Sequence, residues 1–304
     1  IKPDYADAHA NLGAAYDSLG KYKEAIKSYK QAIRIEPDYK NAHYNLGHAY
    51  YESGKYEEAI EPYKQAIRLG PDYTNAHFNL GLAYYKSGKH KEAIEAFKQV
   101  IRLGPESANA HFNLGLAYYK SGKHKEAIEA FKQVIRINPD YKNAHYNLGH
   151  VYDKLEKYEE AIEAFKQAIS IDPDYTDAHH NLGVAYGGSG KVEKAIESYK
   201  QAIRIKPDDV NAHVNLGRAY TRSGKYEEAI ESLKQAIRIK PDDAGAHCGL
   251  GDAYRESGRR QESIESYKQA KKLDPDNKTL ANFHLQNEKA IELGLDKIDW
   301  SNIG

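Results

Sequence analysis

The apolar positions of the chain fall into two helical stretches within each unit of 34 residues. In residues 71–104, Ala76, Leu80 and Tyr84 recur at helical spacing, which predicts a first helix. The tripeptide Ser87-Gly88-Lys89 interrupts the pattern and predicts a tight turn. Positions 93, 94, 97, 100 and 101 are apolar and again follow a helical period, which predicts a second helix. Each unit is therefore expected to be a hairpin of two helices, A and B.

Prolines repeat with the same period and separate one hairpin from the next. Because proline cannot continue a helix, each one ends helix B and begins a new unit. A fixed period of this length predicts small units that stack on copies of themselves, since one hairpin alone cannot bury both of its apolar faces. Nine prolines keep the 34-residue spacing: Pro3, Pro37, Pro71, Pro105, Pro139, Pro173, Pro207, Pro241 and Pro275.

One glycine recurs inside every helix A, although an interior glycine costs roughly 1 kcal/mol against alanine. Its recurrence predicts that helix B approaches closely at that point, with a large side chain such as Tyr63 or Phe97 opposite. One position breaks the pattern of the B helices. Pro62 falls inside the second of them, and we expect either a bend there or a late start to that helix.

The order Leu, Gly, Tyr, Gly, Ala, aromatic, Ala, Pro resembles the tetratricopeptide repeat (TPR) over nearly the whole chain. In the first repeat the matching residues are Leu12, Gly13, Tyr16, Gly20, Ala25, Tyr29, Ala32 and Pro37. The resemblance implies an all-α fold, a right-handed superhelix (α-solenoid) with helix A on the concave face and helix B on the convex face. One departure is systematic, because histidine stands where the family often has tryptophan. These residues are His9, His43, His77, His111, His145, His179, His213 and His247.

We assign residues 1–274 to eight tandem helix-turn-helix repeats, with boundaries 3–36, 37–70, 71–104, 105–138, 139–172, 173–206, 207–240 and 241–274. Residues 275–294 are expected to form a capping helix, because the last hairpin of a solenoid needs a polar-backed cover. Residues 295–304 form a tail that contains the only tryptophan, Trp300. The tail either folds onto its own cap or docks into a neighbouring molecule.

Asparagines form two rows on the predicted A helices. An amide side chain can donate and accept hydrogen bonds and therefore matches a peptide backbone. The rows resemble the asparagine ladder in the TPR superhelix of O-linked N-acetylglucosamine transferases, and the alternative is that they bond neighbouring groups and only support the stack. The first row is Asn11, Asn45, Asn79, Asn113, Asn147, Asn181 and Asn215; the second is Asn41, Asn75, Asn109, Asn143 and Asn211.

Aromatic residues form two further rows on the A helices, restricted to repeats two to five. Aromatic side chains are rigid anchors that are enriched at binding hot spots. Their restriction to four repeats favours binding, and the alternative is packing between neighbouring A helices. One row is Tyr44, Phe78, Phe112 and Tyr146; the other is Tyr51, Tyr85 and Tyr119.

No motif in the chain predicts catalysis, a metal site or a cofactor. The histidines recur one per repeat, whereas helices stand about 8–10 Å apart and zinc ligands lie about 2 Å from the metal, so core-edge packing is favoured. The stretch from Gly187 to Lys191 departs from the phosphate-loop spacing and follows a helix. TPR co-chaperones that clamp the C-terminal carboxylate of Hsp70 or Hsp90 use Lys and Arg. The matching positions here, such as Ala10, Asn41 and Asn75, carry no cation.

The charge balance argues against nucleic acid and membranes as partners. The 44 basic and 44 acidic residues give a formal net charge of zero, and no apolar run approaches the ~18 residues of a membrane span. The single cysteine, Cys248, fits a reducing compartment, so a cytoplasmic location is expected. The chain begins without methionine on what resembles the end of a repeat, and we expect it to be a fragment.

The sequence thus predicts a non-enzymatic scaffold that binds protein or peptide segments in a concave groove. Two alternatives stay open. The chain is a solenoid that self-associates through its ends or the 295–304 tail, or it is the substrate-recognition arm of a larger enzyme.

Overall fold

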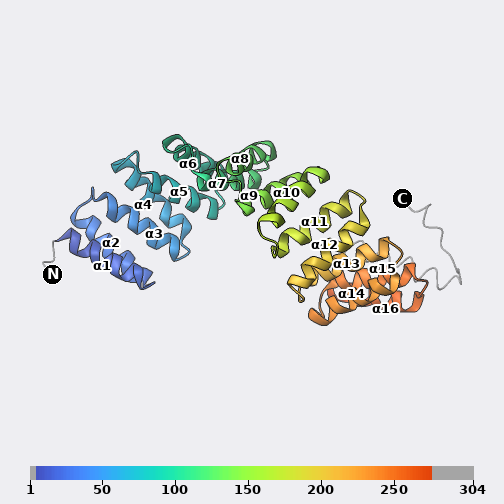
Figure 1. The fold of residues 1–304 in the computed structure, drawn as a ribbon. Coiled ribbons are helices and arrows are strands. Elements are labelled where there is room, and N and C mark those ends of the chain that lie inside the picture. The colour runs from blue at the N-terminus through green and yellow to red at the C-terminus, as the bar shows by residue number, and fades with distance from the viewer. Residues whose placement is uncertain (1–4, 276–304) are drawn as a thin grey trace. The chain divides into compact units, whose positions relative to one another are not determined.

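The structure is a computed structural model that describes residues 5–275, and within that range it contains sixteen α-helices and no strand (Figure 1). The helices form eight pairs of a helix A and a helix B. The A helices are α1 (Ala6–Ser18), α3 (Lys40–Glu52), α5 (Thr74–Lys86), α7 (Ala108–Lys120), α9 (Lys142–Lys154), α11 (Thr176–Gly188), α13 (Val210–Arg222) and α15 (Ala244–Glu256). The B helices are α2 (Tyr22–Ile35), α4 (Tyr56–Leu69), α6 (His90–Leu103), α8 (His124–Ile137), α10 (Tyr158–Ile171), α12 (Val192–Ile205), α14 (Tyr226–Ile239) and α16 (Arg260–Leu273). The predicted all-α architecture of paired helices is confirmed.

The chain divides into two compact units, Ile1–Val151 and Tyr152–Gly304, and the boundary falls within α9. Within each of these two compact units, helix A of a repeat packs against helix B of the same repeat, and that helix B also packs against helix A of the next repeat. Successive A helices touch as well, as α3 and α5 do in the first unit and α13 and α15 in the second.

Each turn from helix A to helix B is closed by backbone hydrogen bonds around a left-handed residue. After α3, the Gly54 N–H donates to the Tyr51 carbonyl and the Lys55 N–H donates to the Tyr50 carbonyl, each over 2.9 Å. This is the Schellman pattern, which requires a positive φ, and Gly54 has φ 77°. The equivalent residue in the fifth repeat is Glu156, the only non-glycine with positive φ in the described range, at 57°.

The glycine inside helix A lies against the large side chain of helix B, as the sequence predicts. A Cβ atom added to Gly47 would stand 2.8 Å from the ring of Tyr63, and one added to Gly81 would stand 2.6 Å from Phe97. Real Cβ contacts do not reach such distances, so any larger residue would push the two helices apart.

The core runs from each hairpin into the next within a unit. In the first unit, Ala59 and Tyr63 of α4 are fully buried, and they form one cluster with Leu80 and Ala83 of α5. A B helix covers one side of two successive A helices, and the opposite side of the A helices carries half-buried residues such as Tyr44, Asn45 and Tyr51 of α3. That side is termed the A-helix face below.

The recurring histidine joins the start of helix A to the preceding turn. His77 Nε2 lies 2.8 Å from the carbonyl oxygen of Pro71, six residues earlier, and donates to it. The same bond, over 2.8–3.0 Å, occurs at His43, His111, His145, His179, His213 and His247. The side chain therefore holds the turn between repeats, in agreement with the predicted position at the edge of the core.

Two expectations at particular segments have different outcomes. Of the two outcomes expected at Pro62, a bend or a late start of the helix, the late start does not occur, because α4 begins at Tyr56 and has 14 residues like every other B helix. The pyrrolidine ring is buried within an uninterrupted helix. The predicted capping helix (275–294) and tail (295–304) lie outside the described residues except for Pro275.

Candidate functional site

The first asparagine row is half-buried on the A-helix face, apart from the exposed Asn11. Asn113, Asn147 and Asn181 each donate from Nδ2 to a backbone carbonyl one turn earlier on the same helix, over 2.7–2.9 Å. These bonds are local, since they join positions four residues apart. They occupy one amide N–H of Asn113 and Asn147 and no described group bonds their amide oxygens.

Two asparagines of this row instead bond a side chain of the preceding repeat. Asn79 Nδ2 donates to the hydroxyl of Tyr44 over 2.9 Å. Asn215 Nδ2 lies 3.2 Å from His180 Nε2. In both pairs the partner stands at the same position of helix A, because His180 takes the position in the sixth repeat that Tyr44 has in the second. At these two repeats the asparagine supports the stack, as the alternative interpretation of the row expects.

The second asparagine row lies in the first turn of α3, α5, α7, α9 and α13 and is exposed. Asn41, Asn75, Asn109 and Asn143 all have solvent-accessible side chains. Asn109 Oδ1 accepts a hydrogen bond from the hydroxyl of Tyr141 over 3.2 Å. Asp7, the equivalent residue of the first repeat, accepts from Tyr39 over 2.6 Å, and this carboxylate raises the pKa of Tyr39 to about 12. The second asparagine row therefore exposes amides to solvent, and Asn109 of this row also holds the tyrosine that precedes the next helix A.

The first aromatic row rests on the buried ring of its own hairpin. The centroids of Phe78 and Phe97 are 5.8 Å apart, and Phe112 and Phe131 have the same separation. Tyr44 lies 5.8 Å from Tyr63, and burial raises the pKa of its hydroxyl. The rings of this row, Tyr44, Phe78, Phe112 and Tyr146, are half-buried. One side of Tyr44, Phe78 and Phe112 thus packs on the buried ring of its own hairpin, and the rest of each of these three rings stays accessible on the A-helix face.

The second aromatic row packs on the first residue of helix B. Tyr51 contacts Tyr56 edge-on with centroids 5.1 Å apart. Tyr85 and Tyr119 lie 5.4 and 5.7 Å from His90 and His124. All three tyrosines are half-buried. This row is therefore held rigidly at the C-terminal end of each helix A.

Sequence reasoning missed a hollow in the second unit, where the aromatic row stops. A cavity of about 610 Å³ is lined by Gly187, Gly188, Arg218 and Arg222 together with Asn215 of the first asparagine row. The signal was present in the sequence, since Gly187 takes the position of Tyr85 and Tyr119. A glycine at that position ends a row of side chains, and the row pattern alone does not predict an open space there.

The titratable groups of the described residues include no cluster typical of a metal centre. Among residues 5–275, no three His, Cys, Asp or Glu side chains come close enough to share a metal ion. Burial raises the pKa of the Cys248 thiol to about 11, so the thiol is protonated at neutral pH. No helix of the described range is long and apolar enough to cross a membrane.

Family models match almost the whole described range. The model described as "TPR repeat" matches residues 16–54, 47–88, 188–223 and 217–258. Models described as "Tetratricopeptide repeat" match residues 78–142, 143–175, 164–197 and 244–277. The matched segments together run from residue 16, in the first helix A, to residue 277, just past the eighth repeat.

Solved structures share the fold over large parts of the chain. A crystal structure of MamA is 32% identical, with a TM-score of 0.52, and the match covers 53% of this chain and 95% of MamA. YrrB, described as "a TPR protein with an unusual peptide-binding site", is 26% identical with a TM-score of 0.52, and the match covers 60% of this chain and 95% of YrrB. The APC/C hetero-tetramer Cut9-Hcn1 is 17% identical with a TM-score of 0.58 over 88% of this chain and 52% of that one, a likeness of fold alone. No curated protein matches the chain.

Proposed function

Because this chain belongs to the tetratricopeptide repeat family, we propose that it is a non-catalytic protein-interaction scaffold that holds extended peptide segments on its A-helix face. The observation that carries the proposal is the co-location of amide and aromatic side chains on that face. YrrB, which has a related sequence and the same fold, is described as having a peptide-binding site, and this likeness supports the same class of partner here.

The asparagines supply contacts to the backbone of the bound segment. A peptide group that leaves water needs a partner for its N–H and its C=O, and an amide side chain provides both. The exposed Asn41 and Asn75 and the half-buried Asn113 and Asn147 meet this need. Asn79 and Asn215 are already bonded to Tyr44 and His180, so they contribute less to the ligand.

The aromatic rows supply contacts to the side chains of the bound segment. Rings that are fixed on one side lose little entropy when the other side is covered, which is the property of a binding hot spot. In the first unit, Tyr85 and Tyr119 are fixed by His90 and His124, and Phe78 and Phe112 are fixed by Phe97 and Phe131. Apolar side chains of the peptide are therefore expected to pack in repeats two to four.

The proposal is tested with peptides selected from a random decapeptide library displayed on phage. The variant Asn113→Ala with Asn147→Ala removes two amides whose bonds within the protein are only local, so the stack is preserved. Two lost hydrogen bonds of ~1 kcal/mol each predict roughly tenfold weaker binding or more by calorimetry. The control, Asn138→Ala, removes an exposed amide between α8 and α9 and is expected to leave affinity unchanged. Equal affinity of the double variant and the unmodified chain for every selected peptide would contradict the proposal.

A further candidate function is self-association, through the ends of the solenoid or through the 295–304 tail, which lies outside the described residues. Light scattering over a range of concentrations, with and without residues 295–304, tests it separately.

A further inference from the structure

Two arginines stand one helical turn apart on the A-helix face of α13. Arg218 and Arg222 are both exposed, and each donates to a backbone carbonyl of a neighbouring helix A. Arg218 Nη2 lies 3.4 Å from the oxygen of Gly245, and Arg222 Nη1 lies 3.3 Å from the oxygen of Gly187. Within the described range, neither guanidinium forms an ion pair with a carboxylate. Like charges four residues apart on a helix repel, so an anionic group that pairs with both arginines relieves this repulsion.

Each side of this pair opens into a cavity, and the two arginines line both. The first cavity, of about 610 Å³, extends toward α10, α11 and α12 and includes Asn215 and Tyr199. The second, of about 670 Å³, extends toward α14 and α15 and includes Thr221 and Gly249. Both volumes fall within the range of roughly 300–1,000 Å³ in which proteins bind small groups. The guanidinium groups can therefore be approached from two sides.

Glycines create this space by replacing larger residues of the other repeats. Gly187 occupies the position of Tyr51, Tyr85 and Tyr119 in earlier repeats. A Cβ atom added to Gly187 would meet only Arg222 Nη1, at 3.8 Å. Gly249 likewise stands where the first asparagine row would continue. The second unit thus has an opening at Gly187, where the first unit has tyrosine, and Arg218 and Arg222 line this opening.

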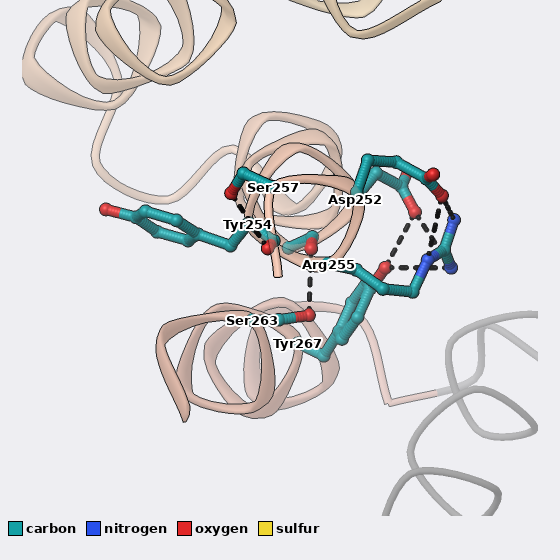
Figure 2. A network of polar contacts seen from close by, with 8 residues as sticks. Asp252, Tyr254, Arg255, Ser257, Ser263 and Tyr267 are labelled. Atoms are coloured by element: carbon teal, nitrogen blue, oxygen red, sulfur yellow. Dashed lines mark hydrogen bonds and ion pairs between the residues drawn. The ribbon is translucent and has the colours of Figure 1, made fainter. Parts of the chain in front are cut away.

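A third arginine of this region, Arg255 on α15, differs from Arg218 and Arg222 because it forms ion pairs with carboxylates. Figure 2 shows it directed toward Asp252 and Tyr267. Its Nη2 lies 2.9 Å from Glu256 Oε1, and its Nη1 lies 3.5 Å from Asp252 Oδ1. Tyr267 in turn donates to Asp252 over 2.6 Å. Asp252 and Glu256, the acidic side chains that line the second cavity, are therefore paired with Arg255 and not with Arg218 or Arg222.

We propose that this surface binds an acidic segment of a partner protein, whose Asp or Glu carboxylates pair with Arg218 and Arg222. Guanidinium groups recognise carboxylates through two parallel hydrogen bonds. Asn215 also lines the first cavity, but its Nδ2 is already bonded to His180, so the two arginines carry the recognition. Lys154 adds a third positive charge to the first cavity. The inference rests on the proposed peptide-binding function and adds the charge of the ligand.

The geometry favours a short acidic peptide over a nucleic acid. The chain has no net charge, and a nucleic acid requires a broad cationic surface along its phosphates. The rim of the first cavity also carries Asp153 and Glu156. A continuous phosphate backbone would be repelled by these carboxylates, whereas two isolated peptide carboxylates can meet the arginines alone.

The test uses a fluorescein-labelled decapeptide of alternating Glu and Gly, with the matching Gln and Gly peptide for comparison, in fluorescence anisotropy at low salt. The variant Arg218→Gln with Arg222→Gln is expected to bind the Glu peptide about tenfold more weakly or worse, because two charge-assisted hydrogen-bond pairs are lost. The control, Arg204→Gln with Arg238→Gln, makes the same change of charge on exposed parts of the B helices of the same unit and is expected to stay within about twofold. Gly187→Tyr, which fills the first cavity with the residue of the earlier repeats, is expected to weaken binding while the helical circular dichroism is unchanged.

Each outcome separates this inference from the proposed function. If the Gln peptide binds as tightly as the Glu peptide, or if the two arginine double variants behave alike, the acidic ligand is ruled out while peptide binding in the first unit stands. If phage-selected peptides bind nowhere but the Glu peptide binds through the arginines, the general function fails and the acidic site stands. If inorganic phosphate displaces the Glu peptide at concentrations where chloride of equal ionic strength does not, the site is a phosphate site and the assignment to carboxylates is overturned.

Discussion

Asn79 donates a hydrogen bond to the hydroxyl of Tyr44, one repeat earlier, over 2.9 Å. The bond joins α5 to α3 on the A-helix face of the first unit. In the next repeat the ring is Phe78, which has no hydroxyl, and Asn113 bonds its own helix instead. An asparagine of this row therefore bonds either the preceding repeat or its own helix. For Asn79 and Asn113, the difference is whether the preceding repeat has a hydroxyl at the position of Tyr44.

Tyr44→Phe is expected to lower the midpoint of urea denaturation. The ring stays on Tyr63, and a part-buried hydrogen bond worth roughly 0.5–1.5 kcal/mol is lost. The reverse change, Phe78→Tyr, places a hydroxyl one repeat before Asn113, at the position that Tyr44 has relative to Asn79. Equal denaturation midpoints for Tyr44→Phe and the unmodified chain would show that the bond contributes nothing to the stack.

Tyr63→Phe is expected to stabilise the protein. Tyr63 is fully buried, its hydroxyl has no hydrogen-bond partner in the described structure, and burial raises its pKa. An unsatisfied buried donor costs ~1–3 kcal/mol, and phenylalanine already holds this position at Phe97, Phe131 and Phe165. The measurement is the urea midpoint of the first unit's transition, followed by circular dichroism.

Tyr267→Phe is the matched control, since the ring is equally buried but its hydroxyl donates to Asp252 over 2.6 Å. This variant is expected to be destabilised, because the carboxylate loses its donor. Opposite signs for the two Tyr→Phe changes are required. If both variants move in the same direction, the hydrogen bonding of the hydroxyls does not decide their effect.

The helical framework could be predicted from the sequence because its signals are local and repeated. Gly47 against Tyr63 and the turn at Gly54 follow from steric rules that apply at every copy. The partners of the surface residues could not be predicted, because Asn79 and Asn113 are identical in sequence context and differ only in what the preceding repeat offers. The cavity beside Gly187 was missed for a related reason. An absent side chain has no periodic signal, and its consequence depends on where Arg218 and Arg222 point.

Pro62→Ala is expected to stabilise the first unit by up to about 3 kcal/mol. Proline inside a helix removes one backbone hydrogen bond and crowds the preceding turn. The third and fourth repeats have alanine at the equivalent position, Ala96 and Ala130, and both side chains are buried. The reverse change, Ala96→Pro, is expected to destabilise by a similar amount. If thermal denaturation of Pro62→Ala shows no gain, packing of the buried pyrrolidine ring offsets the missing bond.

Glu156→Gly is expected to stabilise the turn between α9 and α10 by roughly 1 kcal/mol. Glu156 has φ 57°, a conformation that side chains with a Cβ adopt at a cost, and glycine holds the position in all other repeats with φ of 70–79°. Gly122→Ala is the complementary variant, since nothing lies within 4 Å of a Cβ added there and the cost is conformational alone. It is expected to be destabilised by a similar amount in chemical denaturation. A loss of stability on Glu156→Gly would mean that contacts of the glutamate side chain outweigh the backbone.

His180 makes the second unit sensitive to acid. Burial lowers the pKa of its imidazole, opposed by the negative charges of Asp209 and Asp177. Asn215 Nδ2 can only donate to His180 Nε2, so the bond requires an unprotonated nitrogen, and the ring also packs on Tyr199 at 5.6 Å. The neutral imidazole is therefore the form that fits the fold.

The sign of the pH dependence follows from this shift. Because the folded pKa is below the unfolded value of ~6.5, the unfolded chain binds more protons in this window. The stabilising contribution is fully present above pH ~6.5 and is lost as the pH falls toward the folded pKa. The variant His180→Val introduces the residue that the next repeat has at this position, Val214. It is expected to reduce the change of the urea midpoint with pH between pH 7.5 and pH 5.5. His180→Phe should flatten it equally, and a slope unchanged in both variants would assign the acid sensitivity to other groups.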